Sequence, residues 1–260
     1  MTSLLNVSNL SKSFIQHQGF FRKKEVMAFA PLSFDLERGE TLAIVGESGS
    51  GKSTLAKVLT GVMKPTTGHI RIDGINHSVQ QHEKRCKQIR MIFQDPNTSL
   101  NPRARIGRIL EAPLSLNNSE LTPEQTQQRI EDTLKKVGLL PEHEAFYPIM
   151  LSSSQKQRVA LARALILDPK IIVADEVLAT LDVSVRSQII NLVLQVQKER
   201  GISFIMVAHN IGIVRHISDK ILVMHEGQMV EYGDTLQVLN DPQHIVTKRI
   251  LLNQKIQIRK

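Results

Sequence analysis

The sequence has a single cysteine, Cys86, and no tryptophan, and aromatic residues make up only 4% of it. One thiol cannot form an internal disulfide or a cysteine metal cluster, which favours a reducing compartment. The scarcity of aromatic side chains argues against a surface on which nucleobases stack. The net charge of +8 is therefore better explained by a soluble protein with a basic end than by a nucleic-acid-binding protein.

Long apolar runs are also missing. No stretch approaches the ~20 consecutive apolar residues that span a membrane, and the first 14 residues lack the basic segment and apolar run of a signal peptide. We expect any membrane role to be peripheral. Much of the basic excess lies after Thr247, where no acidic residue occurs: Lys248, Arg249, Lys255, Arg259 and Lys260.

What the sequence does contain is an alternation of short apolar segments with helical patterns, which predicts an α/β fold with a parallel sheet covered on both faces. Apolar segments predict strands at 41–46, 69–74, 90–94, 170–175 and 202–209. Alternating patterns within residues 1–40 predict an antiparallel β edge with a basic loop at 19–25. A hairpin is expected to turn at Glu226 and Gly227.

Residues 95–165 have a different, mostly helical pattern. Thr122 and Gln125 form a capping box with Pro123 at the first helical position, and Gly138 is a natural helix end. We predict one domain in three parts: a core with its β edge (1–94 and 166–235), a helical lobe (95–165) and a short, helical C-terminal tail (236–260).

The segment GESGSGKST follows a predicted strand and precedes a predicted helix, and it fits the G-x-x-x-x-G-K-[ST] pattern of a phosphate-binding loop. Glycines let backbone N–H groups curl around phosphate oxygens, and the helix N-terminus adds its positive end. Lys52 supplies charge to the β- and γ-phosphates, and Ser53 offers a hydroxyl to Mg²⁺. A chance Gly/Ser loop is the weak alternative. The candidate nucleotide-binding residues here are Gly46, Glu47, Ser48, Gly49, Ser50, Gly51, Lys52, Ser53 and Thr54.

Three further polar side chains come at strand ends. Asp175 and Glu176 end an apolar strand, where Asp175 can hold Mg²⁺ through water and Glu176 can polarise the attacking water. An acidic pair there is often only a helix cap, and the phosphate loop makes the catalytic interpretation stronger. His209 ends another strand, and a lone histidine is usually structural; its position at the sheet edge favours contact with a γ-phosphate.

These motifs, in this order, resemble the ATP-binding subunit of an ABC transporter over essentially the whole chain. Residues 46–54 stand at that family's Walker A loop, IIVADE (171–176) at Walker B, Gln94 at the Q-loop, Asp182 at the D-loop and His209 at the switch histidine. The resemblance implies a RecA-like P-loop NTPase core with an antiparallel β edge and a helical signature lobe. It also implies ATP and Mg²⁺ as ligands, with Mg²⁺ near Ser53, Gln94 and Asp175.

Phe14 stands where the family stacks an aromatic ring on adenine; a core phenylalanine at a strand end is the alternative. FQDPNTSLNPRARIGRILEAPL (93–114) resembles the oligopeptide/dipeptide/nickel importer branch. Many members carry a cysteine-rich C-terminal extension for an iron–sulfur cluster, which one cysteine and a short tail do not support. The finer resemblance is to the Sap-type peptide transport subgroup, linked to antimicrobial-peptide uptake and resistance.

LSSSQ (151–155) stands where the family has Leu-Ser-Gly-Gly-Gln. In the family two ATPase domains face each other head to tail, and this segment completes the partner's ATP site. Ser152 and Gln155 are retained, whereas Ser153 and Ser154 add side chains where glycine permits close approach. We consider two explanations equally: a heterodimer in which this chain's own Walker site carries most turnover, or neutral drift.

The resemblance implies an ATPase that powers a membrane transporter at the cytoplasmic face of the bacterial inner membrane, in the direction of import. Expected partners are a second ABC ATPase, two integral permeases and, indirectly, a periplasmic substrate-binding protein, with no nucleic acid. Alternatives are another cargo (nickel, haem or polyamine), a mainly regulatory nucleotide-binding subunit, and a soluble ABC ATPase of repair or translation. Cargo recognition lies in other subunits, so no residue here names the substrate.

Overall fold

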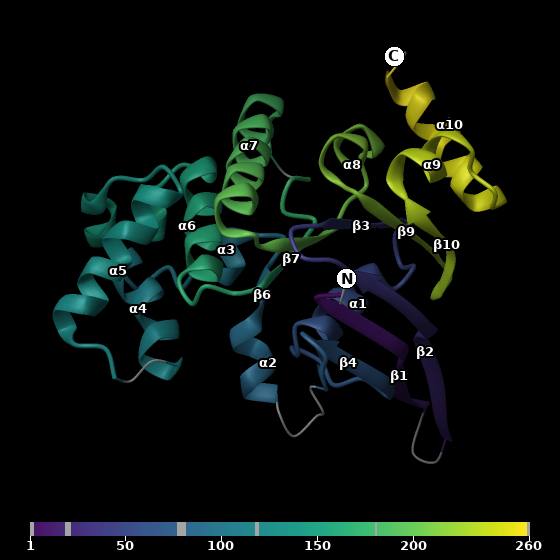
Figure 1. Ribbon diagram of the computed structural model, residues 1–260, viewed down its shortest axis with the longest axis horizontal. Helices are drawn as coiled ribbons and strands as arrows, with labels where there is room; N and C mark the ends of the chain where they lie inside the picture. Colours follow the sequence, from purple (N-terminus) through teal and green to yellow (C-terminus); the bar gives the residue numbers. More distant parts are fainter. Residues whose placement is uncertain (1–2, 19–21, 77–81, 118–119, 180, 259–260) are drawn as a thin grey trace. The chain divides into compact units, whose positions relative to one another are not determined.

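The computed structural model describes residues 3–18, 22–76, 82–117, 120–179 and 181–258. The chain divides into two compact units, one formed by residues 1–86 with 203–260 and the other by residues 87–202. Figure 1 shows the helices and strands of both units. The predicted partition into core, lobe and tail rests on sequence pattern, and it stays a prediction.

The first unit contains an antiparallel sheet in the order β2-β1-β4-β5. Its strands are β1 (Leu5–Gln18), β2 (Arg22–Leu36), β4 (Thr67–Ile72) and β5 (Ile75–Asn76). Leu5, Val7 and Leu10 of β1 are buried because alternate side chains of a strand point to the same face. The expected β edge is confirmed, but β2 begins inside the expected basic loop. Residues 22–25 of the expected basic loop belong to β2, and residues 19–21 lie outside the described residues.

A second sheet in this unit holds the phosphate loop. Strand β3 (Thr41–Gly46) pairs in parallel with β8 (Ser203–Val207) and β9 (Lys220–His225), and β10 (Gln228–Asp234) is antiparallel to β9. Every residue of β3 and β8 is buried, as expected for strands that are covered on both faces. Glu226 and Gly227 both have positive φ (47° and 75°), which confirms the predicted hairpin turn.

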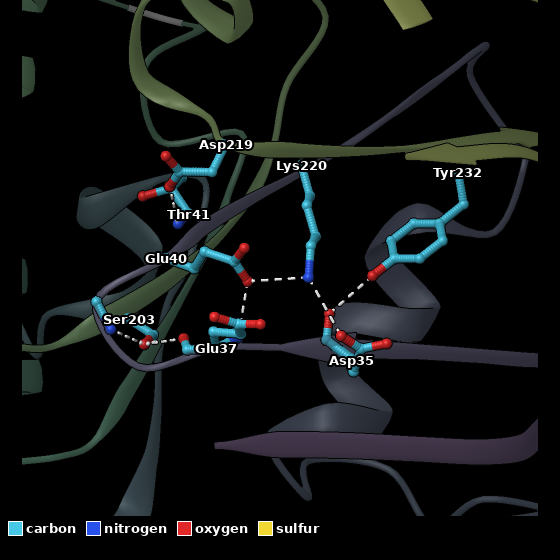
Figure 2. A network of polar contacts seen from close by, with 9 residues as sticks. Asp35, Glu37, Glu40, Thr41, Ser203, Asp219, Lys220 and Tyr232 are labelled. Carbon is cyan, nitrogen blue, oxygen red and sulfur yellow. Dashed lines mark hydrogen bonds and ion pairs between the residues drawn. The ribbon is translucent and has the colours of Figure 1, made fainter. Parts of the chain in front are cut away.

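A polar network fixes the turn between β2 and β3 to the first residues of β9 and to β10 (Figure 2). The Lys220 ammonium donates to Asp35 Oδ2 at 3.1 Å and lies 3.3 Å from Glu40 Oε2, and the Tyr232 hydroxyl donates to the Asp35 carbonyl at 2.9 Å. Partial burial acts to lower the pKa of Lys220, but the hydrogen bond with Asp35 and the charges of Tyr232 and Glu40 outweigh it and raise that pKa above its usual range. Burial also raises the pKa of the Tyr232 hydroxyl. The network lies at the amino end of β9, whereas the phosphate loop follows the carboxyl end of β3.

The first unit also contains the helices α1 (Lys52–Leu59), α8 (Ile211–Ile217), α9 (Thr235–Asn240) and α10 (Ile245–Ile258). The last two lie beside each other near β10, in yellow (Figure 1). Val246 of α10 is buried, and Ile250 and Leu251 pack against a cluster that includes Ala43 and Val45 of β3. The C-terminal tail is therefore helical and is part of the core that carries the phosphate loop.

The second unit contains two parallel strands, β6 (Ile89–Ile92) and β7 (Ile171–Asp175), and most of the helices. The helices are α3 (Pro96–Ser99), α4 (Ile106–Asn117), α5 (Pro123–Lys136), α6 (Ser153–Leu165) and α7 (Val183–Arg200), with short 3₁₀ turns at Pro141–Ala145 and Pro148–Met150. Helix α2 (His82–Gln88) spans the boundary between the units in sequence. The predicted capping box of Thr122 and Gln125 is present, and Gly138 has the expected left-handed backbone (φ 70°). None of the helices in the described part of the chain combines the length and the hydrophobicity that a membrane span requires.

Candidate functional site: a phosphate loop and a paired glutamine and glutamate

The phosphate loop requires glycine at two positions for steric reasons. A Cβ on Gly46 would lie 2.2 Å from the Met224 carbonyl oxygen, and one on Gly51 would lie 2.6 Å from the Ala28 carbonyl oxygen. Both residues have positive φ, 154° and 101°. The loop backbone is therefore packed closely against β9 and β2 without side chains between them, a conformation that glycine alone adopts without strain.

Lys52 lies inside this loop and is only 4% exposed. Its ammonium donates to the carbonyl oxygens of Gly46 (3.0 Å) and Glu47 (2.7 Å), and so it is held by the loop it serves. Helix α1 begins here, and its N-cap residue is Gly51, which has no side chain to accept hydrogen bonds from the N–H groups of the first turn. A buried lysine and an uncapped helix start together fit a phosphate group.

The remaining loop residues differ in their surroundings. The Ser50 hydroxyl is buried and has no hydrogen-bond partner among the described residues, which leaves a polar atom for a ligand or water to satisfy. Glu47, Ser48 and Gly49 are exposed, whereas Ser53 and Thr54 are half-buried. The loop thus has a solvent-facing first half and an enclosed second half.

His209 and Phe14 belong to the same unit as the loop. The Ala208 N–H donates to the Ile44 carbonyl (3.1 Å), which extends the pairing of β8 with β3 to the residue before His209. His209 is exposed, and the next residue, Asn210, caps α8. Phe14 is 39% exposed within β1, and Lys12 Nζ lies 5.1 Å from its ring centre. The alternative of a core phenylalanine is therefore wrong, and an exposed ring on β1 is consistent with stacking.

Gln94, Asp175 and Glu176 come together in the second unit. Strands β6 and β7 run parallel with Ile92 opposite Ala174, so the residues that follow both strands meet at one edge. Gln94 Nε2 donates to Glu176 Oε2 at 3.0 Å, and Asp175 is 5% exposed at the end of β7. Sequence reasoning expected all three residues at strand ends but did not predict the direct contact between Gln94 and Glu176.

Glu176 also has a backbone that non-glycine residues rarely adopt. Its φ is 51°, in the left-handed region, where an L side chain costs roughly 1–2 kcal/mol. Such strained residues gather at active sites, because the surrounding structure forces them into position. The strain supports a catalytic role for this carboxylate.

The signature segment (151–155) starts helix α6 with a capping box. The Ser152 hydroxyl accepts from the Gln155 N–H (3.2 Å), and Gln155 Oε1 accepts from the Ser152 N–H (2.9 Å). Gln155 Nε2 also lies 3.1 Å from His143 Nε2. Ser153 and Ser154 are the first two residues of α6, and neither has a positive φ. Glycine is therefore not needed here for backbone conformation, so the two serines cause no strain.

The D-loop segment precedes α7. Asp182 is the exposed N-cap of α7 and its side chain does not cap the helix, while Thr180 lies outside the described residues. Arg186, in the first turn of α7, donates to the carbonyls of Leu178 (3.1 Å) and Leu181 (2.9 Å) and so links the helix to residues that precede it.

A metal ion would need help from a nucleotide. Among the described residues there is no group of three or more His, Cys, Asp or Glu side chains that could hold an ion by itself. Mg²⁺ commonly takes only one or two protein ligands and completes its shell with water and phosphate oxygens. The residues present fit that mode better than a dedicated metal site.

One contact at the loop was missed by sequence reasoning. The Glu47 carboxylate pairs with Arg249 of α10 (2.8 Å), and its other oxygen lies 3.5 Å from His225 Nδ1. The basic tail was visible in the sequence, but periodicity alone does not show which acidic residue a surface arginine contacts.

A strand that runs into a glycine-bounded lysine loop and then into a helix, beside a parallel sheet, defines a P-loop nucleotide-binding protein. The sequence matches the ABC transporter family over residues 29–179. The chain belongs to this family, and the predicted family and fold class are confirmed.

Among its relatives, the peptide transport system ATP-binding protein SapF of Escherichia coli O6:H1 (strain CFT073) is 55% identical, with 96% of this chain and 92% of the relative covered. The protein of Escherichia coli (strain K12) named putrescine export system ATP-binding protein SapF has the same identity and coverage. The dipeptide transport ATP-binding protein DppF of Haemophilus influenzae is 44% identical over 96% of this chain and 77% of its own length.

Solved structures of ABC ATPases are similar to this chain in fold. CbiO1 of Clostridium perfringens, described as part of an ABC transporter complex, has a TM-score of 0.79 and 28% identity and covers all of this chain and 96% of its own. The ATP-binding cassette MJ0796, solved as a dimer bound to ADP and Pi, has a TM-score of 0.77 and 28% identity and covers 89% of this chain and 98% of its own.

Proposed function

We propose that the chain is the ATP-hydrolysing subunit of a transporter and works with Mg²⁺. The observation that carries this is a phosphate loop complete in its steric detail, together with a strained Glu176 that Gln94 contacts at 3.0 Å. Lys52 and the N–H groups of α1 bind the phosphates, and Phe14 stacks on the adenine. Mg²⁺, for which the family resemblance makes Ser53 and Asp175 candidate ligands, would supply positive charge to the phosphate oxygens.

The protein's own residues orient the water and sense the γ-phosphate. Glu176 accepts a hydrogen bond from the attacking water and polarises it, and Gln94 fixes the carboxylate for this task. His209 contacts the γ-phosphate. Because Glu176→Gln keeps the size and the strained backbone but removes the base, ATP binding should persist while turnover falls by roughly 10²-fold or more. Unchanged turnover in Glu176→Gln would contradict the role of Glu176. If Lys52→Ala still abolished ATP binding, the role of the phosphate loop would stand.

Peptide is the cargo that we propose, with import as the direction. Relatives at 55% and 44% identity are named for peptide and dipeptide transport. A second candidate, a polyamine, rests on the relative named for putrescine export. Vesicles in which the ATPase subunits of the assembled complex face the interior should accumulate labelled peptide when they are loaded with ATP. Transport of putrescine without any peptide would overturn the proposed cargo, and outward movement of the substrate would overturn the proposed direction.

The assembly that we propose has a second ATPase subunit, two permeases and an associated periplasmic binding protein, with this chain at the cytoplasmic face of the inner membrane. The relatives are named as parts of transport systems, and MJ0796 was solved as a dimer. A mild-detergent pull-down should recover permeases. A different ATPase in the same complex supports a heterodimer, whereas this chain alone with permeases refutes it.

In a heterodimer, the Walker site of this chain would carry most turnover, since its loop and its acidic pair are intact while its signature has serine in place of glycine at 153 and 154. Near-normal ATP turnover of the complex with Glu176→Gln would refute this asymmetry. A mainly regulatory subunit, the remaining alternative, would give the same result.

A further inference from the structure

Helix α10 is attached firmly to the unit that carries the phosphate loop. The Glu231 carboxylate of β10 accepts from the N–H groups of Gln243 (2.8 Å) and His244 (3.1 Å) and from the Thr247 hydroxyl, and so it caps the start of α10. Val246 is buried next to this cap. The orientation of the first two turns of α10 is therefore set by the core and not by the surface pair that they make with the loop.

That orientation brings Arg249 to the first residue after Gly46. Its guanidinium donates to Glu47 Oε1 at 2.8 Å, while His225, at the end of β9, lies 3.5 Å from Oε2. Arg249 thus binds one oxygen of the Glu47 carboxylate from outside the loop, and His225 Nδ1 lies near the other oxygen without a hydrogen bond to it. The backbone carbonyl of the same residue accepts from the Lys52 ammonium at 2.7 Å. One residue therefore joins the C-terminal helix to the phosphate-binding lysine.

The carboxylate of Glu47 needs such a partner because of where it stands. A negative charge at the mouth of a loop that receives a triphosphate repels the ligand, and a released carboxylate can compete with phosphate for Lys52. Arg249 counters both effects, since it neutralises the carboxylate and holds it on the side of α10. Lys248, one residue earlier and exposed, has the same charge but forms no ion pair with Glu47 in the part of the chain that the structure describes.

We propose that Arg249 is a positioning residue for nucleotide binding, which acts by holding the Glu47 carboxylate away from the bound phosphates. The inference rests on the proposed function of the loop. Because the pair is about half exposed, its effect is that of a surface ion pair, which corresponds to roughly two- to five-fold in affinity.

The test is titration of the full chain with a fluorescent ATP analogue at low salt. Arg249→Gln should raise the Kd by about two- to five-fold, Lys248→Gln should raise it less, and Arg249→Lys should restore most of the affinity. In Glu47→Gln, which has no carboxylate to hold, the further change Arg249→Gln should have little effect. In the assembled complex, Arg249→Gln should raise KM and leave kcat unchanged, because the residue affects binding and not the chemical step.

Two results would overturn the inference: equal Kd values for Arg249→Gln and Lys248→Gln, or an effect of Arg249→Gln that is as large in the Glu47→Gln background. The first would mean that only general charge matters, and the second that Arg249 acts without Glu47. Failure of the proposed function is distinct, since the wild-type chain would then bind the analogue no better than Lys52→Ala.

Discussion

The strained backbone at Glu176 predicts that glycine gives a more stable protein than alanine at this position, the opposite of their order in the interior of a helix. With φ at 51°, every residue except glycine and, to a lesser degree, asparagine or aspartate costs roughly 1–2 kcal/mol there. Both Glu176→Gly and Glu176→Ala remove the carboxylate and its 3.0 Å hydrogen bond from Gln94, so this loss cancels in the comparison of the two variants. What remains is the relief of strain by glycine, less the extra entropy that glycine gives the unfolded chain, about 0.4–1 kcal/mol.

The expected difference is therefore about 1 kcal/mol in favour of glycine, or roughly 2–4 °C in the midpoint of thermal unfolding for a chain of this size. Asn191, exposed in the middle of α7, provides the matched control. There glycine should be the less stable variant by roughly 1 kcal/mol, because a helix interior disfavours glycine relative to alanine. Differential scanning fluorimetry on the four variants, without nucleotide, measures both differences.

A glycine variant that is less stable than the alanine variant at 176, as at 191, would refute the reasoning. Glu176 would then have an ordinary backbone, and its conformation would be no sign of function. If the sign does invert, the native glutamate is retained at a cost in stability. Both variants at 176 should lose ATP turnover. A glycine variant that is also more stable than the wild type, despite the lost hydrogen bond from Gln94, would show that stability and catalysis oppose each other at this residue.

Three further predictions concern other parts of the chain. Burial tends to raise the pKa of Glu231, but the hydrogen bonds that it accepts from Gln243 and Thr247 outweigh burial and lower this pKa. The contribution of Glu231 to stability is therefore present above about pH 4.3 and is lost as pH falls through the lowered pKa. Glu231→Gln should speed hydrogen exchange in α10 at neutral pH, and the difference from wild type should shrink in acid. Because the pKa of Lys220 is raised, its contribution to stability is fully present below about pH 10.4 and is lost as pH rises through the raised value. Lys220→Met should lower the free energy of unfolding at pH 7 by about 1 kcal/mol, measured by urea unfolding. No change in this variant would mean that the network in Figure 2 contributes nothing to stability. Restoring glycine at 153 and 154 should raise ATP turnover of the complex if the serines impair the partner's site, and should leave it unchanged if they are neutral.

Much of the fold was predictable because its signals are local. The strand and loop around Gly46, the capping box at Thr122 and the hairpin at Gly227 each depend on residues that are neighbours in sequence, and all three are present. The lengths of β1 and β2 were not predictable from the pattern. Their outer parts carry polar residues such as Lys24 and Glu25, which read as a loop, and only pairing between the two strands makes them strands.

The site shows the same division. Residue types and spacing predicted which side chains are candidates for the chemistry, because the phosphate loop and the acidic pair are sequence motifs. The contacts that refine them join distant parts of the chain: Gln94 with Glu176 and Glu47 with Arg249. No periodicity encodes such pairs, and the exposure of Phe14 likewise depends on how the long hairpin is built.

The two helix starts of the chain give a physical account of the serines in the signature segment. Helix α1 begins at a glycine with no side-chain cap, whereas α6 begins with a capping box between Ser152 and Gln155. That box uses the N–H of Gln155 and leaves those of Ser153 and Ser154 outside it. With ordinary helical backbone at both serines, the substitutions keep these two N–H donors and add a Cβ and a hydroxyl beside each one. In the proposed dimer, the cost to a partner's phosphate is therefore one of space and not of lost donors, and the variants with glycine at 153 and 154 measure that space directly.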